Sequence, residues 1–355
     1  MLTRRMALRN SLLASGAALM GSTLAEYSAE ADENLSLHGA GSTFSAPLYK
    51  KWIEAYQQDH KDVSLSYDVV GSGLGVSRFV HGAVDFGATD VLPGGFILST
   101  VKRGVIAVPV TAGMIVLAYN IPGLGGVLNL PKDVYADIFT GHIKVWNDAR
   151  IVQANKDLHL PNRDIAVVVR QDSSGTTAAF TRNLVAISPN WAATGAGDGF
   201  TIDWPTAAML GKGNEGVAQK IKISEGSIGF VEYGFAKRLG LSMAILENDA
   251  GKFVSASEAS GTAALLASER ASVANPLVSV DDVTANPPGD ASYPIVTLSY
   301  LLLYRKYADA RKASALKDWV KWGLTTGQTF ASGLGYIALP AETAAHAGRA
   351  LDSLS

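Results

Sequence analysis

A run of β-branched residues that ends in an arginine and a hydroxyl-rich turn constrains this chain more than any other feature. Residues 167–177 are Val-Val-Val-Arg-Gln-Asp-Ser-Ser-Gly-Thr-Thr, and residues 178–184 have a helical pattern. The segment predicts a strand, a turn and a helix N-terminus. Such a terminus presents free N–H groups and favours an anion, for which Ser174, Thr176, Thr177 and Arg170 add donors. A strand followed by a serine-capped helix without a ligand explains the segment equally well.

Three other turns of small polar residues follow predicted strands, namely Gly41-Ser42-Thr43-Phe44, Gly71-Ser72-Gly73 and Thr89-Asp90. Helix capping explains each turn taken alone. However, strands and helices alternate along the chain, which predicts open and largely parallel α/β sheets. In such sheets the ligand crevice lies beyond the carboxyl ends of the strands. The four turns together therefore predict a cage of neutral donors with one arginine.

The remaining pattern predicts further elements and one irregular segment. The expected strands are at 105–110, 113–119, 165–170, 226–233 and 295–304, the expected helices are at 46–59, 76–81, 134–140, 217–223 and 308–325, and the irregular segment is at 268–292.

Composition excludes several classes of protein. The 355 residues include no cysteine, so a disulfide framework, a thiol nucleophile and a lipoprotein anchor are excluded. The six histidines never pair at i, i+2 or i+4, and no G-x-S-x-G elbow, G-x-G-x-x-G turn or phosphate-loop lysine motif occurs. A net charge of -2 gives no indication of a nucleic-acid partner. We therefore expect neither a metal nor a cofactor.

Residues 1–31 predict an export signal. Paired arginines at 4 and 5 precede a short apolar stretch, and small-residue cleavage positions follow Ala25 and Ala31. The paired arginines favour the twin-arginine route, and an ordinary secretory signal is the alternative. No other segment has 18 uninterrupted apolar residues. We therefore expect a soluble, periplasmic mature protein.

Three segments carry a resemblance to a known family. Residues 39–49, 84–90 and 170–176 resemble the phosphate-binding protein of the bacterial high-affinity phosphate ABC transporter, the PstS family. Supporting segments lie at 120–123, 141–146, 211–216 and 226–233, and the match runs in order from about residue 37 to 340. Two positions depart from the family pattern, because Gly73 stands where a second serine is common and Ser173 where glycine is common.

The resemblance implies a type II periplasmic-binding-protein fold, in which two α/β domains joined by a hinge close over one phosphate. It implies a discontinuous domain I at 32–112 plus 290–345, a domain II at 113–289 and a C-terminal tail at 346–355. It also implies a set of phosphate-binding residues, which are Thr43, Phe44 (through its backbone N–H), Ser72, Asp90, Arg170, Ser174, Gly175 and Thr176. We expect Asp172 to orient Arg170.

Asp90 supplies a reason to choose among anions. A buried carboxylate repels an anion unless a proton lies between them, and phosphate carries such a proton near neutral pH whereas sulfate does not. We therefore expect a monomeric, non-enzymatic binding protein that delivers inorganic phosphate to the membrane permease of an ABC importer. The alternatives are a binding protein for sulfate, molybdate or a phosphonate, an exported phosphatase, and an adhesion or scaffolding protein of the same fold.

Overall fold

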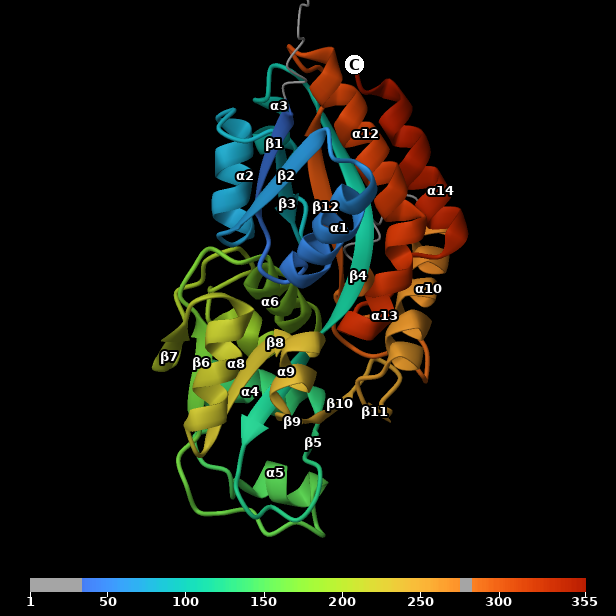
Figure 1. The fold of residues 1–355 in the computed structure, drawn as a ribbon. Coiled ribbons are helices and arrows are strands. Elements are labelled where there is room, and N and C mark those ends of the chain that lie inside the picture. The colour runs from blue at the N-terminus through green and yellow to red at the C-terminus, as the bar shows by residue number, and fades with distance from the viewer. Residues whose placement is uncertain (1–33, 275–282) are drawn as a thin grey trace, which may run out of the picture. The chain divides into compact units, whose positions relative to one another are not determined.

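Strand β4 (Val105–Asn120) joins two groups of strands, because its two halves have different partners. Residues up to Met114 pair antiparallel with β12 (Val296–Tyr304), and residues from Ile115 pair antiparallel with β8 (Ser227–Glu232). Figure 1 shows β4 passing from the blue and orange strands to the yellow strand. The strand order is β2-β1-β3-β12-β4-β8-β6-β7.

We call the strands and helices on either side of this junction the first and the second wing. The first wing holds the parallel strands β1 (Leu35–Gly41), β2 (Val63–Val69) and β3 (Phe86–Thr89) together with β12. The second wing holds β8 with its parallel neighbours β6 (Ala166–Arg170) and β7 (Ala208–Gly211). The turns that follow these parallel strands contact each other, so the two sets of carboxyl ends face one crevice.

Helices flank the strands of both wings. Those that pack on the strands of the first wing include α1 (Ala46–Asp59), α2 (Ser72–Val80) and α12 (Ala310–Leu324). Those on the second wing include α6 (Gly175–Ile187), α8 (Gly213–Ile223) and α9 (Tyr233–Leu239). The other elements are α3 (Gly95–Ser99), β5 (Asn129–Leu130), α4 (Lys132–Thr140), α5 (Ala149–Ala154), α7 (Pro189–Ala193), β9 (Ser242–Met243), β10 (Ile245–Glu247), β11 (Phe253–Val254), α10 (Glu258–Ala274), η1 (Thr326–Phe330), α13 (Ala331–Leu334), α14 (Ala341–Ala350) and η2 (Leu351–Ser353).

The core explains why the central strands have continuous apolar runs. Every residue of β12 is buried, as expected for a strand that is covered on both faces. Beside it, Trp52 packs edge-on against Trp319 and donates to the carbonyl of Gly327 at 2.8 Å. A Cβ on Gly323 would lie 2.4 Å from the Trp52 ring, so a glycine is required where α12 crosses this side chain.

Two predictions about the elements need correction, and one strand was missed. The separate strands at 105–110 and 113–119 are one strand, because a register shift between Ser299 and Tyr300 of β12 absorbs the irregularity and Ala112 bonds to Ile337 in both directions. The segment 268–292 was predicted to be irregular, but α10 continues to Ala274. The short strand β7 was not predicted, because its four residues Ala-Met-Leu-Gly lack a strand pattern.

The computed structural model describes residues 34–274 and 283–355. The predicted export signal at 1–31 therefore lies outside the described residues. Among the helices of the described part, none combines the length and the apolarity needed to cross a bilayer. The segment predicted as a tail, 346–355, contains the end of α14, where Ala347 is buried, and η2, where Leu351 is buried.

Candidate functional site

The carboxylate of Asp90, directly after β3, is almost completely enclosed in the crevice. The residue is 1% exposed. Its Oδ1 accepts hydrogen bonds from Ser42 Oγ at 2.5 Å and Ser299 Oγ at 3.0 Å, and its Oδ2 accepts one from Ser72 Oγ at 3.1 Å. A carboxylate offers about four acceptor positions. Three are filled by hydroxyls of the first wing, so one position on Oδ2 remains.

The open side of Asp90 faces the start of helix α6 on the second wing. A Cβ placed on Gly175, the first residue of α6, would lie 2.5 Å from Asp90 Oδ2 and 2.4 Å from Ser72 Oγ. Only a residue without a side chain fits at this distance. The structure thus brings Ser72 and Asp90 of one wing against Gly175 and its neighbour Ser174 of the other.

Arg170, at the end of β6, is held in place by side chains of its own wing. Its Nε donates to Asp172 Oδ1 at 2.9 Å, its Nη2 donates to Asp172 Oδ2, and its Nη1 donates to Thr176 Oγ1 at 3.2 Å. Asp172 also accepts from the backbone N–H of Gly213 at 2.8 Å. Burial acts to raise the pKa of Asp172, but the hydrogen bonds and charge of Arg170 outweigh it and lower that pKa. The orienting contact expected between Asp172 and Arg170 is present.

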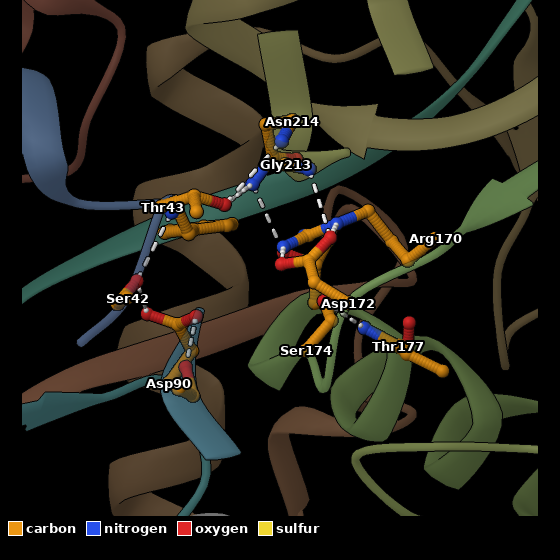
Figure 2. A network of polar contacts seen from close by, with 12 residues as sticks. Ser42, Thr43, Asp90, Arg170, Asp172, Ser174, Thr177, Gly213 and Asn214 are labelled. Atoms are coloured by element: carbon orange, nitrogen blue, oxygen red, sulfur yellow. Dashed lines mark hydrogen bonds and ion pairs between the residues drawn. The ribbon is translucent and has the colours of Figure 1, made fainter. Parts of the chain in front are cut away.

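Asn214, the second residue of α8, links hydroxyls of the two wings. Its Nδ2 donates to Thr43 Oγ1 at 3.0 Å and to Thr176 Oγ1 at 3.1 Å, and its Oδ1 accepts from the N–H of Glu232 at 2.9 Å. Figure 2 shows Asn214 next to Thr43, with Arg170 and Asp172 on the other side of Gly213.

The hydrogen-bond donors around Thr43 and Thr176 determine whether these two hydroxyls can donate to a ligand or accept from it. Thr43 Oγ1 accepts from both the backbone N–H and the side chain of Asn214, and Thr176 Oγ1 accepts from Asn214 and Arg170. A hydroxyl has two acceptor lone pairs and one O–H. Both oxygens are therefore saturated as acceptors, and each O–H is left to donate to a ligand that accepts.

The sequence analysis assigned no ligand contact to Asn214, Ser42 or Ser299, although Ser42 lies in one of the four predicted turns. Helix α8 was expected to begin at residue 217, so Asn214 was placed in a turn. Ser299 interrupts a fully buried, largely apolar strand. Because a buried hydroxyl requires a hydrogen-bond partner, this interruption is the signal that could have marked Ser299 as a polar contact.

Two predicted site residues have protein partners of their own. Ser174 Oγ caps α6 by accepting from Thr177 N at 3.1 Å, which leaves its O–H free to donate to a ligand. The N–H of Phe44, which was predicted to face the ligand, donates to Ser42 Oγ at 3.0 Å, and the Phe44 ring lies in the core.

The crevice is rich in donors but not strongly cationic. The charge of Arg170 is balanced by Asp172. Burial raises the pKa of Asp90 to about 6, although three serine hydroxyls and Arg170 oppose the shift. Burial likewise raises the pKa of Glu232 to about 8, opposed by the N–H groups of Gly234 and Phe235.

Among the described residues, no group of three or more His, Cys, Asp or Glu is placed to hold a metal ion.

A cleft of about 700 Å³ leads from Thr43 and Asn214 towards the surface between α1, α8 and α9. Its lining carries charges of both signs, because Lys50, Lys51, Lys212 and Arg238 lie beside Glu54, Asp172 and Glu215. The cleft thus gives access to the site without a strongly cationic lining.

The fold and this crevice define a binding protein of the PBP superfamily, and a family model described as a PBP superfamily domain matches residues 27–326. Among solved structures, the fold is similar to that of a high-affinity periplasmic phosphate-binding protein (PfluDING) bound with phosphate. The TM-score is 0.69 at 21% identity, over 88% of this chain and 92% of that chain. The predicted α/β fold of the periplasmic-binding-protein type is confirmed.

Curated relatives narrow the class further. The phosphate-binding protein PstS of Methanocaldococcus jannaschii is 37% identical over 334 residues, which cover 89% of this chain and 85% of that protein. PstS of Pasteurella multocida is 36% identical over 308 residues, which cover 86% and 87%. The chain belongs to the PstS family of phosphate-binding proteins. It is accordingly a binding protein and not an enzyme.

The shifted pKa of Asp90 predicts a pH-dependent stability. Because the folded-state pKa of about 6 exceeds the ordinary value of 3.8, the folded protein binds more protons than the unfolded chain between these values. Stability contributed by this group therefore falls as pH rises through that window. We expect Asp90→Asn to gain stability relative to wild type between about pH 4 and 6, by on the order of 3 kcal/mol, and to gain no more above it. Urea unfolding without added anion measures this difference, and a difference that does not vary with pH contradicts it.

The buried hydroxyl of Thr177 has no hydrogen-bond partner in the described structure. Removing an unsatisfied buried hydroxyl while keeping the shape relieves its desolvation cost. We expect Thr177→Val to raise the free energy of unfolding by about 1 kcal/mol. Ser174→Ala, which removes the cap of the same helix, should lower it by about 1 kcal/mol. Thermal and urea unfolding of the two variants compare these effects, and a destabilised Thr177→Val protein would show that the hydroxyl has a partner.

Proposed function

We propose that this protein binds inorganic phosphate and delivers it to the membrane permease subunits of an ABC importer. The observation that carries the proposal is the single open acceptor position on Asp90 Oδ2, which faces the N-terminus of α6 across the crevice. Every other polar group assigned to the site donates. A ligand that matches this arrangement is an anion with several acceptor oxygens and one proton, which describes phosphate near neutral pH.

The proposed ligand contacts follow from the polarity of each group. Arg170, the free O–H groups of Thr43, Ser174 and Thr176, and the N–H groups at the start of α6 donate. Ser72 donates either to Asp90 or to the ligand, and Asp90 accepts the proton of the phosphate. A contact from the N–H of Phe44 requires it to be shared with Ser42 Oγ.

Asp90 provides the discrimination between anions. With a pKa of about 6, the carboxylate is largely ionised at neutral pH. Sulfate brings no proton, so it must either face the ionised carboxylate in a dry crevice or bind with Asp90 protonated, which costs about 1.4 kcal/mol at pH 7. This contact opposes sulfate without weakening protonated phosphate.

We further propose that residues 32–112 plus 290–345 and residues 113–289 move as two domains about the middle of β4. Support comes from the change of partner strand at Met114 and Ile115 and from the polar contacts that close the crevice between the wings. Opening would separate Thr43 from Asn214 and admit the ligand. The family and the N-terminal signal pattern also support a monomer that acts in the periplasm after cleavage near Ala25 or Ala31.

Titration calorimetry of the mature protein tests the function. We expect phosphate and arsenate to bind at the same site, because both are protonated tetrahedral anions, and sulfate to bind far more weakly. Asp90→Asn should weaken phosphate binding roughly 10- to 100-fold, since it replaces a charged acceptor. It should also reduce the preference for phosphate over sulfate. If wild-type protein binds sulfate as tightly as phosphate, the protein is a binder of another oxyanion and this function is wrong.

Replacement of Asn214 tests the polarity of the site. Asn214→Ala frees the Thr43 and Thr176 hydroxyls to rotate, and we expect roughly tenfold weaker phosphate binding from lost preorganisation. Asn214→Asp turns both hydroxyls towards its own carboxylate and adds a charge, so we expect a loss of about 100-fold or more. Asn155→Ala is the control, because Asn155 is equally buried and bonds to backbone carbonyls within the second wing. Wild-type affinity in Asn214→Ala would remove Asn214 from the site.

A further inference from the structure

Two turns from opposite wings contact each other beside the proposed phosphate site. The backbone N–H of Gly73, near the start of α2, donates to the carbonyl oxygen of Ser173 at 3.1 Å. Their neighbours Ser72 and Ser174 are both in the proposed ligand set. The separation of the wings at this contact therefore bears on the distance across the ligand.

The side chain of Ser173 occupies the space that a side chain at position 73 would need. A Cβ on Gly73 would lie 1.8 Å from Ser173 Oγ and 2.6 Å from Ser173 Cβ. Rotation of Ser173 moves its Oγ but leaves its Cβ in place. Because carbon atoms in contact lie about 3.5–4.0 Å apart, a side chain at 73 requires the two backbones to separate by about 1 Å.

The neighbouring Gly71 excludes a simple sideways shift of the turn. It has a φ of +93°, and a Cβ there would lie 2.6 Å from both the carbonyl oxygen of Ser173 and Asp172 Oδ2. Asp172 is held in turn by Arg170 and by Gly213. The turn at 172–174 is thus fixed on the side of its own wing, and a side chain at 73 must push the wings apart.

We propose that positions 73 and 173 form one steric unit that determines how closely the wings approach, and hence the affinity for phosphate. The unit accepts one side chain, at either position, but not two. The proposal rests on the proposed function at one point, because it takes phosphate as the ligand that the two wings enclose.

A double-mutant cycle tests the unit with four proteins, which are wild type, Gly73→Ser, Ser173→Gly and the double variant. We expect Gly73→Ser to weaken phosphate binding about 100-fold, which is near the upper range of coupling between contacting residues. Ser173→Gly alone should stay within about tenfold of wild type. The double variant should return to within about tenfold of wild type, because one side chain is again present. Unaltered binding in Gly73→Ser, or a double variant no better than Gly73→Ser, overturns the proposal.

A second measurement separates this proposal from the proposed function. The natural chain has no cysteine, so Phe96→Cys on the first wing and Ile223→Cys on the second give one dye pair. Both side chains are more than 80% exposed, which favours labelling. We expect a larger dye separation in Gly73→Ser than in wild type, and recovery in the double variant, with or without phosphate. If wild type fails to bind phosphate, the proposed function is wrong, but the dye separations of the four proteins still test whether positions 73 and 173 form one steric unit. Equal separations in all four proteins contradict the unit even where phosphate binds.

Discussion

The buried carboxylate of Asp90 is the constraint on which the rest of the crevice depends. An ionised carboxylate removed from water is destabilising unless hydrogen bonds replace its hydration. Ser42, Ser72 and Ser299 supply three such bonds from three different elements, so the ends of β1 and β3, the start of α2 and the middle of β12 are held together around one charge. The one unfilled acceptor position is then the position that a protonated ligand can satisfy.

Hydroxyl polarity matters as much as charge in this site. A threonine hydroxyl in water donates and accepts, and would serve many ligands. Here Asn214 and Arg170 saturate the acceptor lone pairs of Thr43 and Thr176, which makes both residues obligatory donors. In the proposed site these donors compensate the charge of an anion although Asp172 already balances Arg170. We propose that fixed donors in a closed crevice supply the affinity and that the single acceptor supplies the discrimination.

The sequence predicted the features that depend on neighbouring residues. Arg170, Asp172 and the capped start of α6 lie within one strand–turn–helix segment, and Asp90 ends an apolar strand. Ser299 and Asn214 could not be placed in this way, because Ser299 lies 209 residues from Asp90 and Asn214 lies 171 from Thr43. Likewise the length of β4 depends on pairing with β12 and β8, and local sequence around residues 111–113 resembles a break.

Close approach between the wings requires positions without side chains, because backbone groups take part in closure. Gly175 lies against Asp90, Gly73 against Ser173, and Gly234 against the carbonyl of Leu334, where a Cβ would come within 2.3 Å. Each glycine lies at the first or second position of a helix. Free N–H groups of a helix N-terminus can reach a ligand or the opposite wing only where no Cβ intervenes. The N–H of Gly73 already donates to the carbonyl of Ser173 and that of Gly234 to Glu232, so of these three only Gly175 offers a helix N–H to the proposed ligand. In the proposed closure, the missing side chains at Gly73 and Gly175 set how near the two wings come.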